Sequence, residues 1–328
     1  MQVMGIRHRK NIINQWKSHF YIAGTDERRW ADYLKKMFLR KVPTFPSTVQ
    51  IQTRTGCNGG CIFCPYTASV EYMPKGTMSD DLFKKIVLEI AKYRKTRRIS
   101  PYLMNEPFLD PKLLERSRYI KQTIPNSRIT ITTNGSKLSP ELIDELMKDN
   151  PFHHIFISMQ GIEKEPYENT MRGSLKFEET KRNVEYLIQK RNQFHPELKI
   201  TVTMVKTNLV DVDKAINYWK NLGVNSKYTA LENRGGNNPS FHKLNPGKSI
   251  RFNHCTRLFK QAYILFNGDM VLCCTDYFKT MVLGNVAESS IYEVWNSPRA
   301  IKIRQDFIRG DFSDNPLCAS CLISSEGM

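Results

Sequence analysis

Three cysteines lie close together in the sequence at a spacing suited to metal binding. Cys57, Cys61 and Cys64 form a C-x3-C-x2-C motif on a glycine-rich loop, directly after a predicted strand at 49–53. Three thiolates on a four-iron cluster leave the fourth iron free for another ligand, whereas structural zinc is closed by four ligands. The motif therefore favours an iron-sulfur cluster. The alternatives are zinc with a distant fourth ligand and cysteines that bind no metal.

The other five cysteines lie near the C-terminus. Four of them fit one closed site with the pattern C-x12-G-x4-C followed later by C-x2-C: Cys255, Cys273, Cys318 and Cys321. These thiolates fit a second iron-sulfur cluster or, alternatively, zinc. Cys274 is left over. Three roles remain open for it: a buried inert thiol, a hydrogen-atom donor, or a ligand that exchanges roles with Cys273.

Strand-like and helix-like segments alternate between these two cysteine groups. Strands are predicted at 49–53, 99–104, 129–133, 155–159, 200–205 and 227–231, with amphipathic helical patterns between them. Such alternation implies parallel strands joined by right-handed crossovers. The expected fold class is therefore α/β, as an open doubly wound sheet or a partial TIM-like (β/α)6 barrel. The first cysteine motif would leave the C-terminal end of a strand, where barrels place their chemistry.

The cysteine spacing, with Phe63 before the third cysteine, resembles the radical S-adenosylmethionine (SAM) superfamily, which implies the partial barrel. Later strand ends carry further matches, in the family's order. Met104-Asn105-Glu106-Pro107 is similar to the family's Gly-Gly-Glu-Pro element, with Asn105 in place of a glycine. The resemblance implies SAM contacts near the adenine, ribose, amine and carboxylate from Phe63, Glu106, Thr133, Asn134, Ser158 and Arg172. In it, Glu106 receives the methionyl amine and Arg172 pairs with the carboxylate.

The C-terminal cysteines resemble the SPASM class of radical SAM enzymes, in its shorter Twitch form with one auxiliary cluster. The nearby sequence Leu283-Gly284-Asn285-Val286 also resembles the C-terminal extension of that class. The resemblance implies two [4Fe-4S] clusters, the first on Cys57, Cys61 and Cys64 and the auxiliary one on Cys255, Cys273, Cys318 and Cys321. We expect three parts: a basic helical N-terminal extension at 1–45, the barrel at 46–240 and the auxiliary domain at 241–328.

The resemblance also implies a reaction. An electron from the first cluster would cleave SAM, and the resulting radical would remove a hydrogen atom from substrate. We expect an oxidoreductase that turns a sugar or aminocyclitol alcohol into a ketone, with an external donor such as flavodoxin or ferredoxin. Cys274 and Asp276 are the catalytic candidates, with Asp276 or Tyr277 as proton acceptor. The alternative is a radical SAM epimerase or peptide (RiPP) maturase that uses Cys274 as hydrogen donor.

Composition limits the partners. The chain has 328 residues and a net charge of +17, and residues 1–43 hold ten Lys or Arg against three acids. Such charge attracts nucleic acid, anionic membranes or phosphorylated substrates, or is simply a solvated surface. Because the sequence shows no long apolar run and no signal peptide, we expect a cytoplasmic protein without a membrane span. A zinc-bearing nucleic-acid binder is the non-enzyme alternative, but no cysteine and histidine finger pattern supports it.

Overall fold

The computed structural model describes residues 43–93, 96–245, 247–252 and 255–324. The helix expected in the N-terminal extension lies outside the described residues, so it stays a prediction. Over the ranges that are described, every helix is too short or too polar to cross a membrane.

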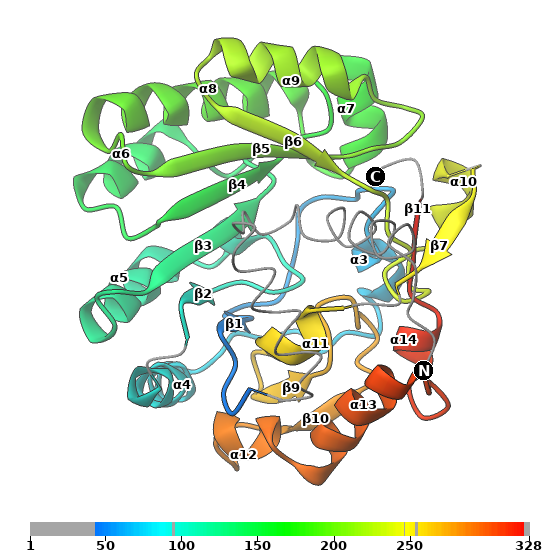
Figure 1. Ribbon diagram of the computed structural model, residues 1–328. Helices are drawn as coiled ribbons and strands as arrows, with labels where there is room; N and C mark the ends of the chain where they lie inside the picture. Colours follow the sequence, from blue (N-terminus) through cyan, green and yellow to red (C-terminus); the bar gives the residue numbers. More distant parts are fainter. Residues whose placement is uncertain (1–42, 94–95, 246, 253–254, 325–328) are drawn as a thin grey trace, which may run out of the picture.

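Six parallel strands form most of one curved sheet, in the order in which they occur in the chain (Figure 1). They are Thr48–Ile51 (β1), Arg98–Ser100 (β2), Arg128–Thr133 (β3), His154–Ser158 (β4), Lys199–Val205 (β5) and Asn225–Thr229 (β6). In register, Val49 lies opposite Ile99, and Ile155 lies opposite Ile200. The strand order never reverses, as it would in a doubly wound sheet. The predicted α/β fold with a partial (β/α)6 barrel is therefore confirmed.

Helices connect these strands and cover one face of the sheet. They are Asp80–Lys92 (α4), Leu113–Thr123 (α5), Pro140–Lys148 (α6), Lys164–Met171 (α7), Phe177–Phe194 (α8) and Val212–Asn221 (α9), with short turns at Tyr66–Ser69 (α3) and Pro107–Leu109 (η1). Ser79, Ser139 and Asp211 are the N-caps of α4, α6 and α9, and each side chain accepts a hydrogen bond from the backbone N–H three residues later.

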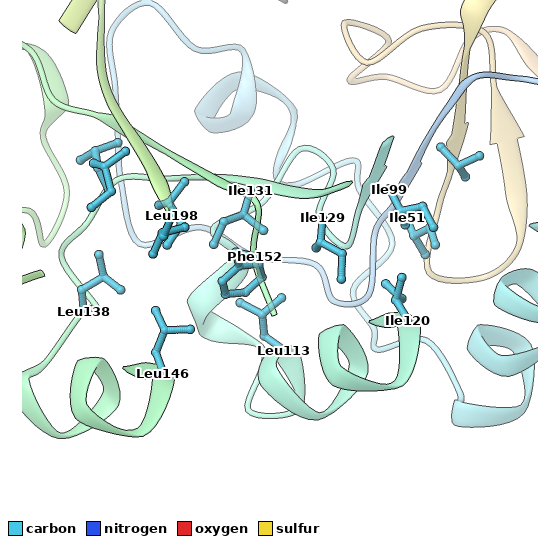
Figure 2. Close-up of a cluster of buried hydrophobic side chains, with 14 of the residues drawn as sticks. Ile51, Ile99, Leu113, Ile120, Ile129, Ile131, Leu138, Leu146, Phe152 and Leu198 are labelled. Atoms are coloured by element: carbon cyan, nitrogen blue, oxygen red, sulfur yellow. The ribbon is translucent and has the colours of Figure 1, made fainter. Parts of the chain in front are cut away.

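Apolar strand residues pack under these helices and form the core. Ile129 and Ile131 of β3 are fully buried in one cluster with Ile120 of α5 and Leu146 of α6 (Figure 2). Successive residues of a strand point to opposite faces. The residues that alternate with these isoleucines therefore lie on the inner, concave face of the half barrel.

The inner face carries polar side chains that bond across neighbouring strands. The hydroxyls of Ser100 and Thr130 lie 2.9 Å apart, and those of Tyr102 and Thr132 lie 2.7 Å apart. Each of these contacts joins a residue in or just after β2 to one in β3. Polar groups therefore line the interior of the half barrel where β2 and β3 lie side by side.

The C-terminal part adds three strands to the same sheet beyond β1. Gln261–Ile264 (β8) pairs in parallel with β1, and Asp269–Val271 (β9) and Val282–Asn285 (β10) follow in antiparallel pairing. The other elements are Phe241–Leu244 (α10), Ser249–Arg251 (β7), Arg257–Lys260 (α11), Ile291–Trp295 (α12), Pro298–Arg309 (α13), Pro316–Ala319 (α14) and Leu322–Ser324 (β11). The sheet therefore continues past residue 240, and the domain division there stays a prediction.

Helix α4 holds the C-terminal part against the barrel. The Nζ of Lys85 donates to the carbonyls of Val286 and Ala287, each at 2.8 Å. The carboxylate of Glu89 accepts from the backbone N–H groups of Ile291 and Tyr292, at 2.8 and 2.9 Å. Hydrogen bonds to charged groups are among the stronger ones in proteins. They fix the position of the C-terminal part relative to β1 and its cysteine loop.

Candidate active site

The first cysteine motif lies on a loop that leaves the C-terminal end of β1. This loop runs beside the segment at the end of α7. The backbone N–H of Gly60 donates to the carbonyl of Met171 at 3.1 Å, and that of Ile62 donates to Thr170 at 2.9 Å. These hydrogen bonds between distant parts of the chain hold the loop in a fixed conformation.

Two glycines allow close packing around this loop. A Cβ at Gly59 would lie 3.5 Å from the Sγ of Cys61 and 3.7 Å from that of Cys57. A Cβ at Gly173, which has a φ of +70°, would lie 2.6 Å from the carbonyl oxygen of Asn58. The nearest atom to the Cβ position of Gly59 is Cδ1 of Leu175, at 3.1 Å. Glycine at 59 therefore allows Leu175 to pack beside the two sulfurs, and glycine at 173 allows the two segments to touch.

The thiols of this loop lie in an environment that suits ligands of a metal cluster. Burial raises the pKa of Cys57 to about 12, and burial together with the neighbouring cysteines raises the pKa of Cys61 well above its usual value. Thiolates held so close together need a positive charge among them, and bound iron supplies it. The residues present therefore fit a four-iron cluster.

Glu106 lies in a buried hydrogen-bond network at the strand ends. Its carboxylate accepts from the hydroxyl of Thr133 at 2.5 Å and from the backbone N–H groups of Asn134 and Phe108 at 2.8 and 3.2 Å. The residue is 2% exposed, and burial raises its pKa to about 7. These contacts favour a role in joining the ends of β2 and β3. The contact with a methionyl amine that the sequence predicts stays untested.

Thr133 and Asn134 extend this network to the cysteine loop. The hydroxyl of Thr133 donates to Glu106 and accepts from the N–H of Gly135 at 3.0 Å. The side-chain amide of Asn134 donates to the side chain of Asn58 at 2.9 Å. The network thus connects the end of β3 with the loop that carries the first three cysteines.

The three remaining cofactor candidates lie on separate elements. Phe63 is 7% exposed and belongs to the barrel core. Ser158 is the half-buried last residue of β4. Arg172 is exposed just after α7, and its Nε donates to the carbonyl of Asn169 at 3.0 Å. A Cβ at Gly60 would lie 3.4 Å from the Cβ of Arg172, so this arginine lies at the edge of the cysteine loop.

The C-terminal cysteines come together around one pocket. Its lining includes apolar side chains, Arg257 and the four thiols expected there: Cys255, Cys273, Cys318 and Cys321. Burial raises the pKa of Cys318 to about 12 and also raises that of Cys321. Four thiols around one pocket fit a cluster with no open iron.

Neither cysteine group is arranged around one metal ion. In the part of the chain that the structure describes, no three side chains of His, Cys, Asp or Glu are placed to hold a single ion. This finding concerns one ion with all its ligands at a common centre. A four-iron cluster instead binds each cysteine to a separate iron.

The loop after β6 supports the auxiliary pocket. Glu232 accepts two hydrogen bonds from Arg257, at 2.8 and 3.1 Å. The side chain of Asn233 donates to the carbonyl of Ser320 at 2.6 Å and accepts from the N–H of Leu322 at 2.7 Å. The end of the barrel is therefore tied directly to the segment that carries the last two cysteines.

The side chain of Cys274 interacts with that of Cys273, which lines this pocket. Cys274 packs against the same buried apolar cluster as Cys64 and Tyr66, whereas Cys273 packs against the cluster next to Cys255. Cys274 thus neighbours both cysteine groups, whereas Cys273 lines the auxiliary pocket. This placement agrees with Cys273 as the ligand and Cys274 as the remaining thiol, an assignment that stays a proposal.

The carboxylate of Asp276 is buried and hydrogen-bonded within a turn. It is fully buried, and its carboxylate accepts from the N–H and hydroxyl of Thr280, at 2.9 and 3.0 Å, and from the N–H of Met281 at 2.8 Å. These hydrogen bonds close a turn after the auxiliary cysteines. The contacts favour a turn-stabilising role over the catalytic role that we expect from the sequence, because both oxygens already have donors.

Two residues beside the first cysteine group belong to no sequence motif. Asn58 links the loop to Asn134, and the hydroxyl of Tyr66 accepts from the N–H of Cys57 at 2.9 Å. Both lie within two residues of a predicted ligand, which is the signal that could have found them. Loops that carry metal ligands need such supporting contacts to orient the ligands.

A half barrel with a three-cysteine loop after its first strand, followed by a four-cysteine pocket, defines a class of enzymes that combine SAM with iron-sulfur clusters. Residues 51–218 match the radical SAM superfamily, and residues 255–322 match an iron-sulfur cluster-binding (SPASM) domain. The chain belongs to the radical SAM superfamily. The predicted cofactors, [4Fe-4S] clusters and SAM, are those of this family.

Similar proteins include two enzymes and one solved structure. The AdoMet-dependent heme synthase of Methanosarcina barkeri (strain Fusaro / DSM 804) is 25% identical over 240 residues, 72% of this chain and 64% of that protein, so less than two thirds of that relative is spanned. The S-adenosyl-L-methionine-dependent 2-deoxy-scyllo-inosamine dehydrogenase of Niallia circulans is 23% identical over 278 residues, 84% of this chain and 92% of that one. The crystal structure of BtrN in complex with AdoMet and 2-DOIA has a TM-score of 0.58 at 21% identity, covering 84% and 93% of the two chains. This structural likeness shows the fold.

Proposed function

We propose that this radical SAM enzyme oxidises a secondary alcohol of a sugar or aminocyclitol to a ketone. The observation that carries the proposal is the pocket lined by four C-terminal cysteines beside the half barrel. Four ligands close a cluster, which leaves it no site for a second cofactor but allows it to accept an electron. Similarity to an aminocyclitol dehydrogenase over 84% of the chain supports this choice.

We assign Cys57, Cys61 and Cys64 to the first cluster and the pocket cysteines to the auxiliary cluster. When bound, the clusters and SAM supply the hydrogen-abstracting radical and an acceptor for the electron left on the substrate. The chain itself holds and orients these groups. In this proposal Arg172 pairs with the cofactor carboxylate, and the network of Glu106, Thr133 and Asn134 keeps the strand ends in place.

The inner face of the half barrel suits a substrate rich in hydroxyl groups. Of the hydroxyl pairs between β2 and β3, that of Tyr102 and Thr132 lies toward the strand ends from which the cysteine loop leaves. Hydroxyl groups both donate and accept hydrogen bonds, so they can bind the alcohol groups of a sugar. A small carbohydrate-like substrate is therefore proposed, with flavodoxin or ferredoxin as the external electron donor.

Isotope transfer tests this function. Reconstituted enzyme would be incubated with SAM, reductant and a panel of sugars and aminocyclitols deuterated at the carbinol carbons, beside deuterated peptides. We expect deuterium in the deoxyadenosine formed with one of the alcohols, together with a ketone product. Transfer from a peptide carbon, with none from any alcohol, would contradict the dehydrogenase and favour the peptide maturase.

Epimerisation is the second candidate, and the packing of Cys274 against the same apolar cluster as Cys64 favours it. An epimerase must return a hydrogen atom to the substrate, and a thiol can supply one. Cys274→Ser keeps the volume but removes the sulfur. We expect this variant to form deoxyadenosine and ketone at nearly the wild-type rate. If it formed deoxyadenosine but no product, while wild-type enzyme incorporated solvent deuterium, the epimerase would replace the dehydrogenase.

A further inference from the structure

The hydroxyl of Tyr277 lies 3.6 Å from the Sγ of Cys64. We propose that Tyr277 is a positioning residue that donates a hydrogen bond to Cys64 and thereby raises the reduction potential of the first cluster. The inference rests on the proposed function, in which Cys64 is a ligand of that cluster. It gives the C-terminal part a direct influence on the site where SAM is cleaved.

The surroundings of Tyr277 fix its hydroxyl beside the sulfur. The residue is 9% exposed and packs in one apolar cluster with Leu103, Met104 and Tyr263, which are 1%, 7% and 0% exposed. A thiolate bound to iron has no proton to donate, whereas a phenol has one. Tyrosine is therefore the donor in this contact. In apolar surroundings such a hydrogen bond is stronger than it would be in water.

The direction of the effect follows from charge. Reduction adds one electron to the cluster and makes its sulfur ligands more negative. A hydrogen bond to a ligand sulfur then stabilises the reduced form more than the oxidised form, which raises the potential. A cluster that accepts an electron more readily is loaded more readily by an external donor.

A short turn connects this hydrogen bond to the auxiliary site. Tyr277 follows the proposed ligand Cys273 by four positions, and the N–H of Asp276 donates to the carbonyl of Cys273 at 3.1 Å. The carboxylate of Asp276 holds the other side of the turn through Thr280 and Met281. In this proposal the buried carboxylate of Asp276 has a structural role and transfers no proton. It stabilises the turn that places the hydroxyl of Tyr277 beside Cys64.

Redox titration of the holoenzyme tests the proposal. Tyr277→Phe removes the hydroxyl and keeps the ring, and the first cluster is identified by the change of its electron paramagnetic resonance signal when SAM is added. We expect unchanged iron content and a midpoint potential shifted to a more negative value. Tyr72→Phe is the matched control, because Tyr72 is 74% exposed and its ring lies beside Phe278, the neighbour of Tyr277. It should leave the potential unchanged.

Three results would overturn the inference: an unchanged potential in Tyr277→Phe, an equal shift in Tyr72→Phe, or a loss of iron in Tyr277→Phe, which would show a purely structural role. Failure of the proposed alcohol oxidation would show in the isotope test and leave this potential shift intact, whereas failure of the cluster assignment would look different again. In that case wild-type protein itself would give no cluster signal that responds to SAM.

Discussion

Arg257 and Glu232 form a two-point ion pair between the loop after β6 and the auxiliary pocket. Two guanidinium nitrogens of Arg257 lie 2.8 and 3.1 Å from the two carboxylate oxygens of Glu232. The side chains of Arg257 and Glu232 are 18% and 8% exposed. Since Arg257 also lines the four-cysteine pocket, the pair joins the barrel to the auxiliary site.

Removal of Glu232 should destabilise the protein strongly. Glu232→Ala leaves the guanidinium of Arg257 buried without its partner, which costs about 3–5 kcal/mol of unfolding free energy. Anaerobic denaturant unfolding measures the loss. The control is Glu163→Ala, which breaks an ion pair with Lys214 whose two side chains are 48% and 51% exposed. That change should cost no more than about 1 kcal/mol. Equal losses in the two variants would contradict the role given to the buried pair.

Gly173→Ala should impair the first cluster selectively. The added Cβ would lie 2.6 Å from the carbonyl oxygen of Asn58 and 2.9 Å from the N of Gly60, so the cysteine loop must move. We expect iron content to fall by about four per chain, the content of one cluster. Gly223→Ala is the matched control, because Gly223 also has a φ of +70° but no atom lies within 4 Å of its Cβ position.

The control separates steric contact from backbone strain. Gly223→Ala should lower the free energy of unfolding by about 1–2 kcal/mol, because alanine is strained in the left-handed backbone conformation. This variant should retain both clusters. Iron analysis and anaerobic unfolding of the two variants decide the matter. Full iron content in Gly173→Ala would show that the close approach to Asn58 does not position the loop.

Stability should depend on pH through Glu106. Burial raises its pKa from 4.5 to about 7. Between these values the folded state keeps the proton that the unfolded state has lost, so the free energy of unfolding falls as pH rises. The slope is up to about 1.4 kcal/mol per pH unit, and it levels off above pH 7. Glu106→Gln should lack this component.

Denaturant unfolding between about pH 5.5 and about pH 7.5 measures the difference, since other titrating groups contribute equally to both proteins. Glu165→Gln, at an exposed position in α7, should keep the wild-type slope. If Glu106→Gln and wild type had the same slope, the buried carboxyl of Glu106 would not be protonated in the folded state.

Local patterns in the sequence were sufficient to predict parallel strands that alternate with helices, and the resemblance to the radical SAM superfamily predicted the half barrel. Ser79 and Ser139 stand where helical periodicity begins, and both are N-caps in the structure. The strand predicted at 99–104 is wrong in extent, because β2 ends at Ser100 and Met104 takes a φ of 54°. The strands β8 to β10 have three or four residues each, too few for a recognisable period.

The candidate site could be predicted only in part, because some of its contacts join residues that are far apart in the sequence. Cysteine spacing is local, so both cysteine groups could be found from the sequence. Tyr277 contacts Cys64, and Glu106 contacts Thr133 and Asn134. These contacts join different elements, so no spacing of residues in the sequence predicts them. Asp276 was predicted as catalytic because a carboxylate beside cysteines suggests proton transfer. Its burial and its hydrogen bonds with Thr280 and Met281, which indicate the turn, are not visible in the sequence.

Arg172→Ala should weaken SAM binding. If the guanidinium pairs with the carboxylate of the cofactor, its loss costs about 1.5–3 kcal/mol, or roughly tenfold or more in Kd. Equilibrium dialysis of the anaerobic protein measures this change. Arg299→Ala, at an exposed position in α13, is the control for lost surface charge and should bind normally. An unchanged Kd in Arg172→Ala would refute the contact.

Iron and sulfide analysis tests the central claim most directly, when it is combined with an assay of SAM cleavage. Anaerobically purified wild-type protein should contain about eight irons and eight sulfides, the sum of two four-iron clusters. The variant in which Cys57, Cys61 and Cys64 are all replaced by Ala should retain about four of each and form no deoxyadenosine. Cleavage of SAM by this variant, or only about four irons in the wild-type protein, would contradict the account.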